Sequence, residues 1–386
     1  MEKIFYFDNA ATSFPKPESV YENIDGFMRN RCANPGRSAH KMSLESSRAV
    51  FRCRELICKL FKASSSEQII FTSNATEALN LAIIGFLKEG ATVLTSSAEH
   101  NSVMRPLNFL AAARRIKVAR IKHNSNGIVD YRDFKEKLSL KPSLVVVNHA
   151  SNVFGAITDL EPFLEYKKKS GFRLLVDASQ SAGVTDIDLS SHEIDFLAFT
   201  GHKSLYGVQG TGGLYVKEPD ILTPIKFGGT GSFSENEIQP EFLPDKFESG
   251  TPNCVGLTGL QKGVEFVMEK GVKNIFIHKK KLVKYFIDKL NSVNGIRLFY
   301  GESLENNVGV VSLVARNVSS SSLAMILDRK YNIAVRPGLH CAPFAHKVIN
   351  TFPTGTVRFS FSIFNNIDEL DYAVKAVKEI ISEKSE

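Results

Sequence analysis

The first half of the chain alternates between apolar runs and amphipathic segments. Mostly apolar runs predict strands at residues 68–72, 92–98, 117–122, 143–148 and 173–177. Segments with helical periodicity predict helices between them, at residues 76–88, 102–115, 130–138 and 159–170. Near-continuous apolar strands between amphipathic helices are typical of a mostly parallel sheet that is covered on both faces. The pattern therefore predicts an α/β domain.

The pattern changes after Gly256. The expected elements there are helices at 274–293, 320–331 and 368–382, and strands at 296–300, 308–315, 333–335 and 356–364. This mixture predicts a smaller α+β domain. We expect the hinge between the two parts near residues 252–259.

Composition narrows the class of protein. The 386 residues are 43% hydrophobic and 23% charged, which is typical of a soluble globular protein of about two domains. The net charge is +7, but the basic residues are dispersed. The densest cluster, residues 279–281, lies in a helical pattern and is predicted to be a solvated helix face. We therefore expect no nucleic-acid partner.

The five cysteines are odd in number and form no CxxC motif. The N-terminus enters a strand-like segment directly, without a signal-like stretch, and no apolar run approaches about 18 residues. These features predict free thiols, a cytoplasmic location and no membrane partner.

Two residues at the ends of apolar strands suggest cofactor chemistry. Lys203 ends the sequence Thr200-Gly-His-Lys203, which follows an apolar run at 195–199 and precedes a glycine-rich turn at 207–213. Asp177 ends the apolar strand at 173–177. A lysine can form a Schiff base with an aldehyde cofactor, and an acid can keep a pyridinium nitrogen protonated. The pair therefore indicates pyridoxal phosphate (PLP) chemistry.

Further polar residues follow other strands and are expected at the same edge of the sheet. The turn Ser73-Asn-Ala-Thr76 precedes a helix, whose N-terminus favours a phosphate, although it could be an ordinary helix cap. His100 could stack on a planar ring or move protons, or it could cap a helix. Asn152 could donate a hydrogen bond to the phenolic oxygen of the cofactor.

A thiol is the third chemical group. Cys341 ends the stretch Arg336-Pro-Gly-Leu-His-Cys341, in which the Pro-Gly pair forces a turn. His340 could lower the thiol pKa if it is close and charged. Cys341 could instead be a buried structural cysteine. A zinc site made by Cys341, His340 and His346 has poor spacing and lacks further ligands, so no metal is expected.

These residues together resemble a known family. The motifs are Tyr6-Phe-Asp-Asn-Ala-Ala-Thr12, Asn74-Ala-Thr-Glu77, Glu99-His100, Ser151-Asn152, Asp177-Ala-Ser-Gln180, Thr200-Gly-His-Lys203, Phe247-Glu-Ser-Gly-Thr-Pro252, Arg336-Pro-Gly-Leu-His-Cys-Ala342 and Thr356-Val-Arg358. In this order they resemble the cysteine desulfurase and selenocysteine lyase group of class V aminotransferase-type, fold-type I PLP enzymes. The short stretch before Cys341 is similar to the group II branch.

The resemblance implies a fold and a division of the chain. The fold is α/β, with a large domain at residues 15–257 built on a mostly parallel sheet of the seven-stranded type. Residues 1–14 and 258–386 would form the smaller α+β domain. The resemblance also implies a homodimer, in which Thr251 of one subunit reaches the cofactor phosphate of the other.

The resemblance also implies roles for individual residues. Catalytic roles fall to Lys203, which holds the cofactor as a Schiff base, to Cys341, which attacks the substrate sulfur or selenium, and to His100, which stacks on the ring. Asp177 would pair with the ring nitrogen and Gln180 with the ring oxygen. The remaining cofactor-binding residues would be Ala75, Thr76, Asn152, Thr200, His202 and Thr251. Asn152, Arg336 and Arg358 would bind the substrate, with Arg358 as a bidentate partner of its carboxylate.

The implied reaction converts L-cysteine to L-alanine and leaves a persulfide on Cys341, which a sulfur-acceptor protein would take up for iron–sulfur cluster assembly. Selenocysteine lyase activity on L-selenocysteine is the main alternative, followed by a class V aminotransferase and a kynureninase-like hydrolase, which would not need the thiol. A non-catalytic scaffold is disfavoured because Lys203 and Asp177 are both present. The segment after Cys341, with Ala342-Pro-Phe-Ala-His346 and Thr351-Phe-Pro-Thr-Gly355, departs from the family pattern and leaves the acceptor open.

Overall fold

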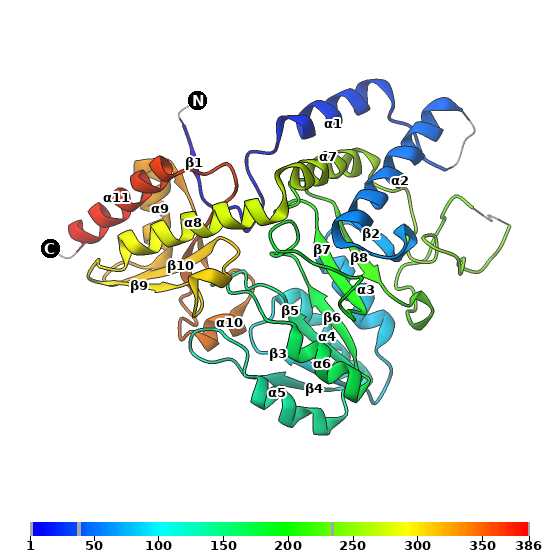
Figure 1. The fold of residues 1–386 in the computed structure, drawn as a ribbon, viewed down its shortest axis with the longest axis horizontal. Coiled ribbons are helices and arrows are strands. Elements are labelled where there is room, and N and C mark those ends of the chain that lie inside the picture. Colours follow the sequence, from blue (N-terminus) through cyan, green and yellow to red (C-terminus); the bar gives the residue numbers. More distant parts are fainter. Residues whose placement is uncertain (1–2, 37–39, 233–234, 385–386) are drawn as a thin grey trace.

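A computed structural model describes residues 3–36, 40–232 and 235–384 (Figure 1). Its centre is a seven-stranded sheet with the strand order β2-β8-β7-β6-β5-β3-β4. The bounds are β2 Ile69–Thr72, β3 Thr92–Ser96, β4 Lys117–Ile121, β5 Leu144–Asn148, β6 Arg173–Asp177, β7 Phe196–Thr200 and β8 Gly212–Val216. The strands from β7 to β4 are parallel, so the predicted mostly parallel sheet is confirmed.

Strand β8 was missed because its sequence begins inside the predicted glycine-rich turn. It runs antiparallel to both β7 and β2. A Cβ atom on Gly213 would lie 2.8 Å from the carbonyl oxygen of Ile70 and 2.4 Å from the ring of Phe199. The glycines are therefore needed for close packing within the sheet as well as for the turn.

Helices cover both faces of this sheet. On one face lie α2 Lys41–Phe61, α5 Tyr131–Lys137, α6 Glu161–Ser170 and α7 Cys254–Lys270, which share one apolar core with the strands. The other face carries α3 Ala75–Phe86 and α4 Asn101–Arg114, which pack in a second core. Helix α1 Glu18–Asn30 packs against α7 on the outside (Figure 1). No bounds were predicted for α1 and α2, although the stretches around Cys53 and Cys58, which lie in α2, are helix-like in sequence.

The chain after α7 forms a separate apolar core together with Phe7 near the N-terminus. We call this the second part of the chain. A four-stranded antiparallel sheet has the order β12-β13-β10-β9, and β1 pairs with β11 in a small parallel sheet. The strand bounds are β1 Phe5–Tyr6, β9 Ile296–Phe299, β10 Val310–Ala315, β11 Ile333–Ala334, β12 Arg336–Gly338 and β13 Thr356–Ser360. The helices are α8 Val272–Leu290, α9 Ser320–Tyr331, α10 Pro343–Val348 and α11 Ile367–Glu383.

The expected hinge region, residues 252–259, includes the start of a regular helix, since α7 begins at Cys254 and is capped by the side chain of Asn253. Helix α7 ends before Gly271, where φ is +78°, and α8 follows directly. The predicted domain limits themselves stay a prediction.

The expectation that residues 279–281 form a solvated helix face is wrong for Lys279. That side chain is only 5% exposed, whereas the apolar Ile277 of the same helix is 48% exposed. In a helix, positions 275, 279, 282 and 286 lie on one face, and in α8 this face is buried. Burial lowers the pKa of Lys279 to about 7, and its amine lies 3.3 Å from the hydroxyl of Ser204.

Within the described residues, every helix is too short or too polar to cross a bilayer.

Candidate active site

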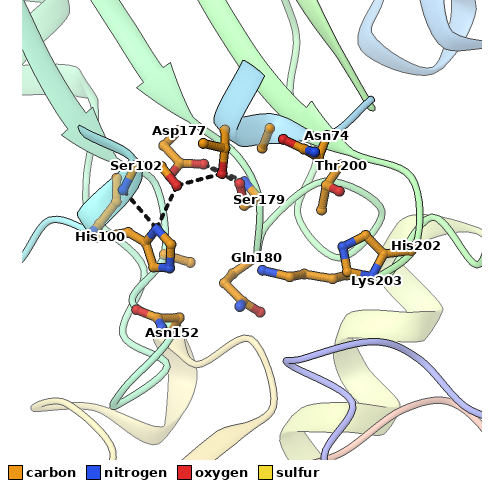
Figure 2. Close-up of a pocket in the computed structure, with 14 residues that line it drawn as sticks. Asn74, His100, Ser102, Asn152, Asp177, Ser179, Gln180, Thr200, His202 and Lys203 are labelled. Atoms are coloured by element: carbon orange, nitrogen blue, oxygen red, sulfur yellow. Dashed lines mark hydrogen bonds between the residues drawn. The ribbon is translucent and has the colours of Figure 1, made fainter. Parts of the chain in front are cut away.

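A cavity opens at the carboxyl ends of the parallel strands, where ligands bind in open α/β sheets (Figure 2). Its lining residues are Asn74, Ala75, Thr76, His100, Ser102, Asn148, Ala150, Asn152, Asp177, Ser179, Gln180, Thr200, His202 and Lys203. We call it the lysine cavity. It brings together nine of the predicted site residues, whereas Arg336, Cys341, Arg358 and Thr251 lie outside its lining.

Lys203 follows β7 and points across the lysine cavity (Figure 2). Burial lowers the pKa of its amine to about 8, the positive charges of Arg358 and Arg336 act in the same direction, and Asp177 opposes them. A lowered pKa increases the neutral fraction of the amine near pH 7. The neutral amine is the form that attacks an aldehyde.

Asp177 is 6% exposed at the end of β6. Its Oδ1 atom accepts hydrogen bonds from the backbone N–H of Ser179 at 2.9 Å and from the Ser179 hydroxyl. A second carboxyl group, Glu99, is fully buried nearby, and burial raises its pKa to about 8. Because Glu99 is then mainly protonated at neutral pH, it adds little negative charge beside Asp177.

His100 is fixed by the start of α4. Its Nδ1 atom accepts a hydrogen bond from the backbone N–H of Ser102 at 3.1 Å and lies 2.8 Å from the Ser102 hydroxyl. That hydroxyl lies 2.7 Å from the hydroxyl of Thr76. Burial and the charge of Lys203 lower the pKa of His100 to about 4, so the ring is neutral near pH 7. With Nδ1 as acceptor, the proton of the neutral ring lies on Nε2.

The turn before α3 can act both as a helix cap and as a phosphate site, so the two interpretations of its sequence are compatible. Asn74 caps the helix, because its side chain accepts from the backbone N–H of Glu77 at 3.0 Å. The first residues of this 12-residue helix, Ala75 and Thr76, line the lysine cavity. Unpaired backbone N–H groups and the helix dipole favour an anion at such a position.

Arg358 is buried on β13, beside the lysine cavity. It forms an ion pair with Asp8 at 2.8 Å and donates a hydrogen bond to the backbone carbonyl of Asn152 at 3.0 Å. Arg336 lies opposite Arg358 in the paired strands β12 and β13. The sheet of the second part therefore brings two guanidinium groups to the edge of the cavity.

Residues 336–341, which we call the thiol loop, are held against the lysine cavity by backbone contacts. The carbonyl of Cys341 accepts from the N–H of Asn101 at 2.8 Å, and the carbonyl of His340 accepts from the Asn152 side chain at 2.7 Å. The Cys341 side chain is exposed, and Nη2 of Arg336 lies 3.5 Å from its sulfur. The reading of Cys341 as a buried structural cysteine is therefore wrong.

The condition for His340 to act on the thiol, that its ring is charged, is not met. His340 is 2% exposed, and its Nε2 atom lies 2.9 Å from the hydroxyl of Thr356. Burial and the nearby charge of Arg358 lower its pKa to about 2, so the ring is neutral at neutral pH. The cation in contact with the sulfur is Arg336.

Comparisons with known proteins decide the family. The family model for class-V aminotransferases matches residues 5–373. A probable cysteine desulfurase of Pyrococcus abyssi is 33% identical over 98% of this chain and 95% of its own length, and one from Borreliella burgdorferi is 32% identical over 99% and 93%. The chain belongs to the class-V aminotransferase family.

Solved structures of this family agree with the sequence matches. The apo cysteine desulfurase of Thermococcus onnurineus is 32% identical and superposes with a TM-score of 0.93 over 98% of this chain and 95% of that one. The cysteine desulfurase CsdA of Escherichia coli, solved as an S-sulfonic acid, is 26% identical with a TM-score of 0.88 over 99% and 95%. The predicted family resemblance, the fold class and the dependence on PLP are confirmed, and the matches support an enzyme of the cysteine desulfurase class.

The lysine cavity fits the PLP of this family. The Nδ1 atom of His202 is a buried ring nitrogen that has no partner among the described residues, although it lines the cavity. A cofactor oxygen could satisfy it. A Cβ atom on Gly201 would lie 2.2 Å from the hydroxyl of Thr211, so only glycine lets the loop of Lys203 pack this closely.

Sequence reasoning missed four residues that shape the site. Ser102 and Ser179 orient His100 and Asp177, Glu99 is buried beside them, and Asp8 pairs with Arg358. The two serines follow the recognised residues by two positions, a spacing at which a side chain can accept from or donate to a local turn. That spacing was a usable signal, whereas no local signal connects Asp8 with Arg358.

Proposed function

We propose that this protein is a cysteine desulfurase that converts L-cysteine to L-alanine and takes the sulfur onto Cys341. The observation that carries the proposal is the exposed thiol of Cys341, 3.5 Å from Arg336, on a loop hydrogen-bonded to Asn101 and Asn152 beside the lysine cavity. A transaminase would need the lysine and the acid but not this thiol.

Arg358 and Arg336 are suited to bind the substrate carboxylate. Arg358 is oriented by Asp8 and by the carbonyl of Asn152, so little conformational freedom remains to be lost on binding. A guanidinium group can make two parallel hydrogen bonds to a carboxylate. Nη2 of Arg336 also lies 3.5 Å from the sulfur of Cys341, so this guanidinium group contacts the thiol as well.

PLP, when bound, supplies the electron sink that stabilises negative charge on the substrate α-carbon. In this proposal Lys203 holds the cofactor, Asp177 keeps its ring nitrogen protonated, and Gln180 contacts its ring oxygen. Its phosphate would be held at the start of α3 by Ala75, Thr76, Thr200 and His202, which line the cavity there. His100 would stack on the ring, and it carries a proton on Nε2, which faces away from Ser102.

The chain's own groups then carry out two steps. Lys203, with its lowered amine pKa, removes the α-proton of the substrate. The thiolate of Cys341 attacks the substrate sulfur, so that an S–S bond forms and the bond from the substrate β-carbon to sulfur breaks. The electron pair of the broken bond stays with the carbon skeleton, which becomes alanine after protonation, while Cys341 carries a persulfide.

We further propose a homodimer with a shared site. Thr251 is exposed and lines a different cavity of its own chain, together with Lys226, Thr230 and Gly250. To contact a cofactor phosphate, it would therefore have to reach into the lysine cavity of another subunit. Exposed apolar side chains lie on elements near this second cavity: Phe51 at 52%, Phe227 at 67% and Phe242 at 43% exposure. A C2 partner would cover them.

The decisive experiment gives the purified PLP-loaded protein L-cysteine and, separately, L-selenocysteine. Alanine is quantified together with sulfide or selenide, and intact-protein mass is recorded before any reductant is added. We expect alanine and a sulfur adduct on Cys341 from cysteine. Alanine from selenocysteine alone would favour the lyase, and pyruvate or a keto acid without alanine would contradict both.

A further inference from the structure

The segment after Cys341, which departs from the family pattern, has two different faces. Its inner face is apolar, because Ala342, Ala345 and Ile349 are buried in a core with Ala98 and Val153. The outer face of α10 carries Phe344 and Lys347, and the exposed Phe352 follows in the next turn. The helix therefore presents a fixed surface beside the thiol.

Two buried histidines anchor the segment from below. The rings of His340 and His346 lie 5.3 Å apart, and Nδ1 of His346 lies 2.7 Å from the hydroxyl of Thr351. Burial lowers the pKa of His346 to about 4 and that of His340 to about 2. Both rings are therefore neutral near pH 7, and they act as packing groups rather than as charges for a partner.

Cations and rings alternate along the outer face. The guanidinium of Arg120, at the edge strand β4, lies 3.8 Å from the ring centre of Phe344, and the amine of Lys347 lies 4.9 Å from the same centre. Lys347 also lies 5.0 Å from the ring centre of Phe352, which is 47% exposed. We call these four residues the basic–aromatic surface.

No carboxylate of the surrounding segments balances these charges. The sequence from Arg329 to Ile367 contains neither aspartate nor glutamate, and neither does the sequence from Lys117 to Val129. The acid that directly follows the second segment, Asp130, caps α5 by accepting from the backbone N–H groups of Arg132 and Asp133, and Asp133 itself pairs with Lys137 and Lys122. These two segments therefore contribute basic and no acidic side chains to the surroundings of the basic–aromatic surface, a charge pattern that favours an acidic partner.

We propose that the basic–aromatic surface binds an acidic segment of the protein that accepts sulfur from Cys341, an inference that rests on the proposed function. The two cations attract and orient the acidic segment, and the rings of Phe344 and Phe352 supply apolar contact area. Phe344, the first residue of this surface after Cys341, follows the thiol by three positions in the chain, so a partner bound there lies near the thiol.

The chemical step at this surface is an exchange at sulfur. A thiolate of the acceptor attacks the outer sulfur of the Cys341 persulfide, which forms a new S–S bond on the acceptor. The bond from Cys341 to that sulfur breaks, and its electron pair returns to Cys341 as thiolate. The acceptor leaves with the persulfide, so no external oxidant or reductant is needed.

The test uses two synthetic peptides, each with one cysteine, of which one is glutamate-rich and the other lysine-rich. The PLP-loaded enzyme is charged with one equivalent of L-cysteine, and sulfur transfer to each peptide is followed by mass spectrometry and divided by the persulfide formed. At low ionic strength we expect the acidic peptide to react about tenfold faster than the basic one. The preference should disappear near roughly 1 M salt.

Variants locate the effect. Arg120→Glu/Lys347→Glu should abolish or reverse the preference, and Lys347→Glu alone, at an exposed position, should reduce it. The control Lys375→Glu/Lys378→Glu makes the same change in net charge on exposed positions of α11, and it should keep the preference. Equal rates for both peptides in the unaltered enzyme, or an equal loss in the α11 control, would overturn the inference. If cysteine leaves no persulfide on Cys341, it is the proposed function that fails.

Discussion

Lys203 lies at the end of a buried central strand, whereas Cys341 lies on an exposed turn between two short elements. The lysine cavity is built by one sheet, and its polar groups are oriented by short-range contacts such as Ser179 to Asp177. The thiol loop is oriented by contacts between the two parts of the chain, from Asn101 and Asn152. The lysine cavity can therefore form within the part of the chain that builds the central sheet, while the position of the thiol depends on both parts.

The backbone of the thiol loop is strained at two residues. His340 and Cys341 both have left-handed conformations, with φ of 50° and 57°, which cost energy for residues that have a Cβ atom. Thr356 and Asn152 hold His340 in this turn through hydrogen bonds at 2.9 and 2.7 Å. The thiol is thus presented by a strained loop that its neighbours hold in place, and this arrangement should make the two regions separable by mutation.

The largest effect is expected for Lys203→Ala. Without the amine, the cofactor cannot be held covalently and the α-proton loses its base, so alanine formation from cysteine should fall by at least about a thousandfold. Borohydride treatment followed by mass spectrometry should show a cofactor adduct on the unaltered protein and none on the variant. An adduct on the variant would place the covalent link at another lysine.

Cys341→Ser should separate the two regions. The lysine cavity is untouched, so PLP should bind and borohydride should still fix it to Lys203. Alanine release from cysteine should fall by about a hundredfold or more, since a hydroxyl is a poor nucleophile towards sulfur. Cys32→Ser, at another exposed cysteine, is the control and should keep the rate. An unchanged rate in Cys341→Ser would mean that the sulfur does not pass through Cys341, and it would move the lyase alternative ahead.

The same contrast explains what the sequence could reveal. Lys203, Asp177, His100 and Asn152 each follow a strand of one sheet, so their meeting at one edge was predictable from the strand order alone. The contact between Arg336 and Cys341 depends on the path of the turn, and sequence spacing suggested His340 instead. Residues that are adjacent in sequence can point in opposite directions: the His340 side chain is buried, whereas the Cys341 side chain is exposed.

Residues whose environment comes from another part of the chain were the least predictable. The lysines next to Lys279 in sequence suggested a solvated cluster. The aliphatic part of its side chain instead packs beside Gly309, and a Cβ atom added to this glycine would lie 2.4 Å from the Cε atom of Lys279. The pairing of Asp8 with Arg358 joins the two ends of the chain. Only the tertiary fold supplies these contacts.

A smaller effect tests the electrostatics of the lysine cavity. Because the lowered pKa of Lys203 is about 8, the apoprotein should take up PLP faster as the pH rises, and the rate should level off above about pH 8. An ordinary lysine, with a pKa of roughly 10.4, would show a rise that continues well beyond pH 9. The uptake rate is read from cofactor absorbance under excess PLP, which requires no substrate.

The smallest effect concerns stability and the carboxyl group of Glu99. Its pKa is raised to about 8 in the folded protein and is roughly 4.3 in an unfolded chain, so the folded state holds one more proton between these values. Stability should therefore fall as the pH rises from about 4.5 to about 8, and this contribution should level off above that range. In Glu99→Gln the side chain can no longer ionise, while its Oε1 atom can still accept from the N–H of Asn148, a bond of 2.8 Å in Glu99. The apoprotein of the variant should thus show a flatter decline in thermal midpoint across this window than the unaltered apoprotein.

The control Glu165→Gln changes an exposed carboxyl group on α6 and should keep the steeper decline. Parallel curves for Glu99→Gln and the unaltered protein would mean that Glu99 is ionised in the folded state, and that Asp177 shares the negative charge of the lysine cavity with it.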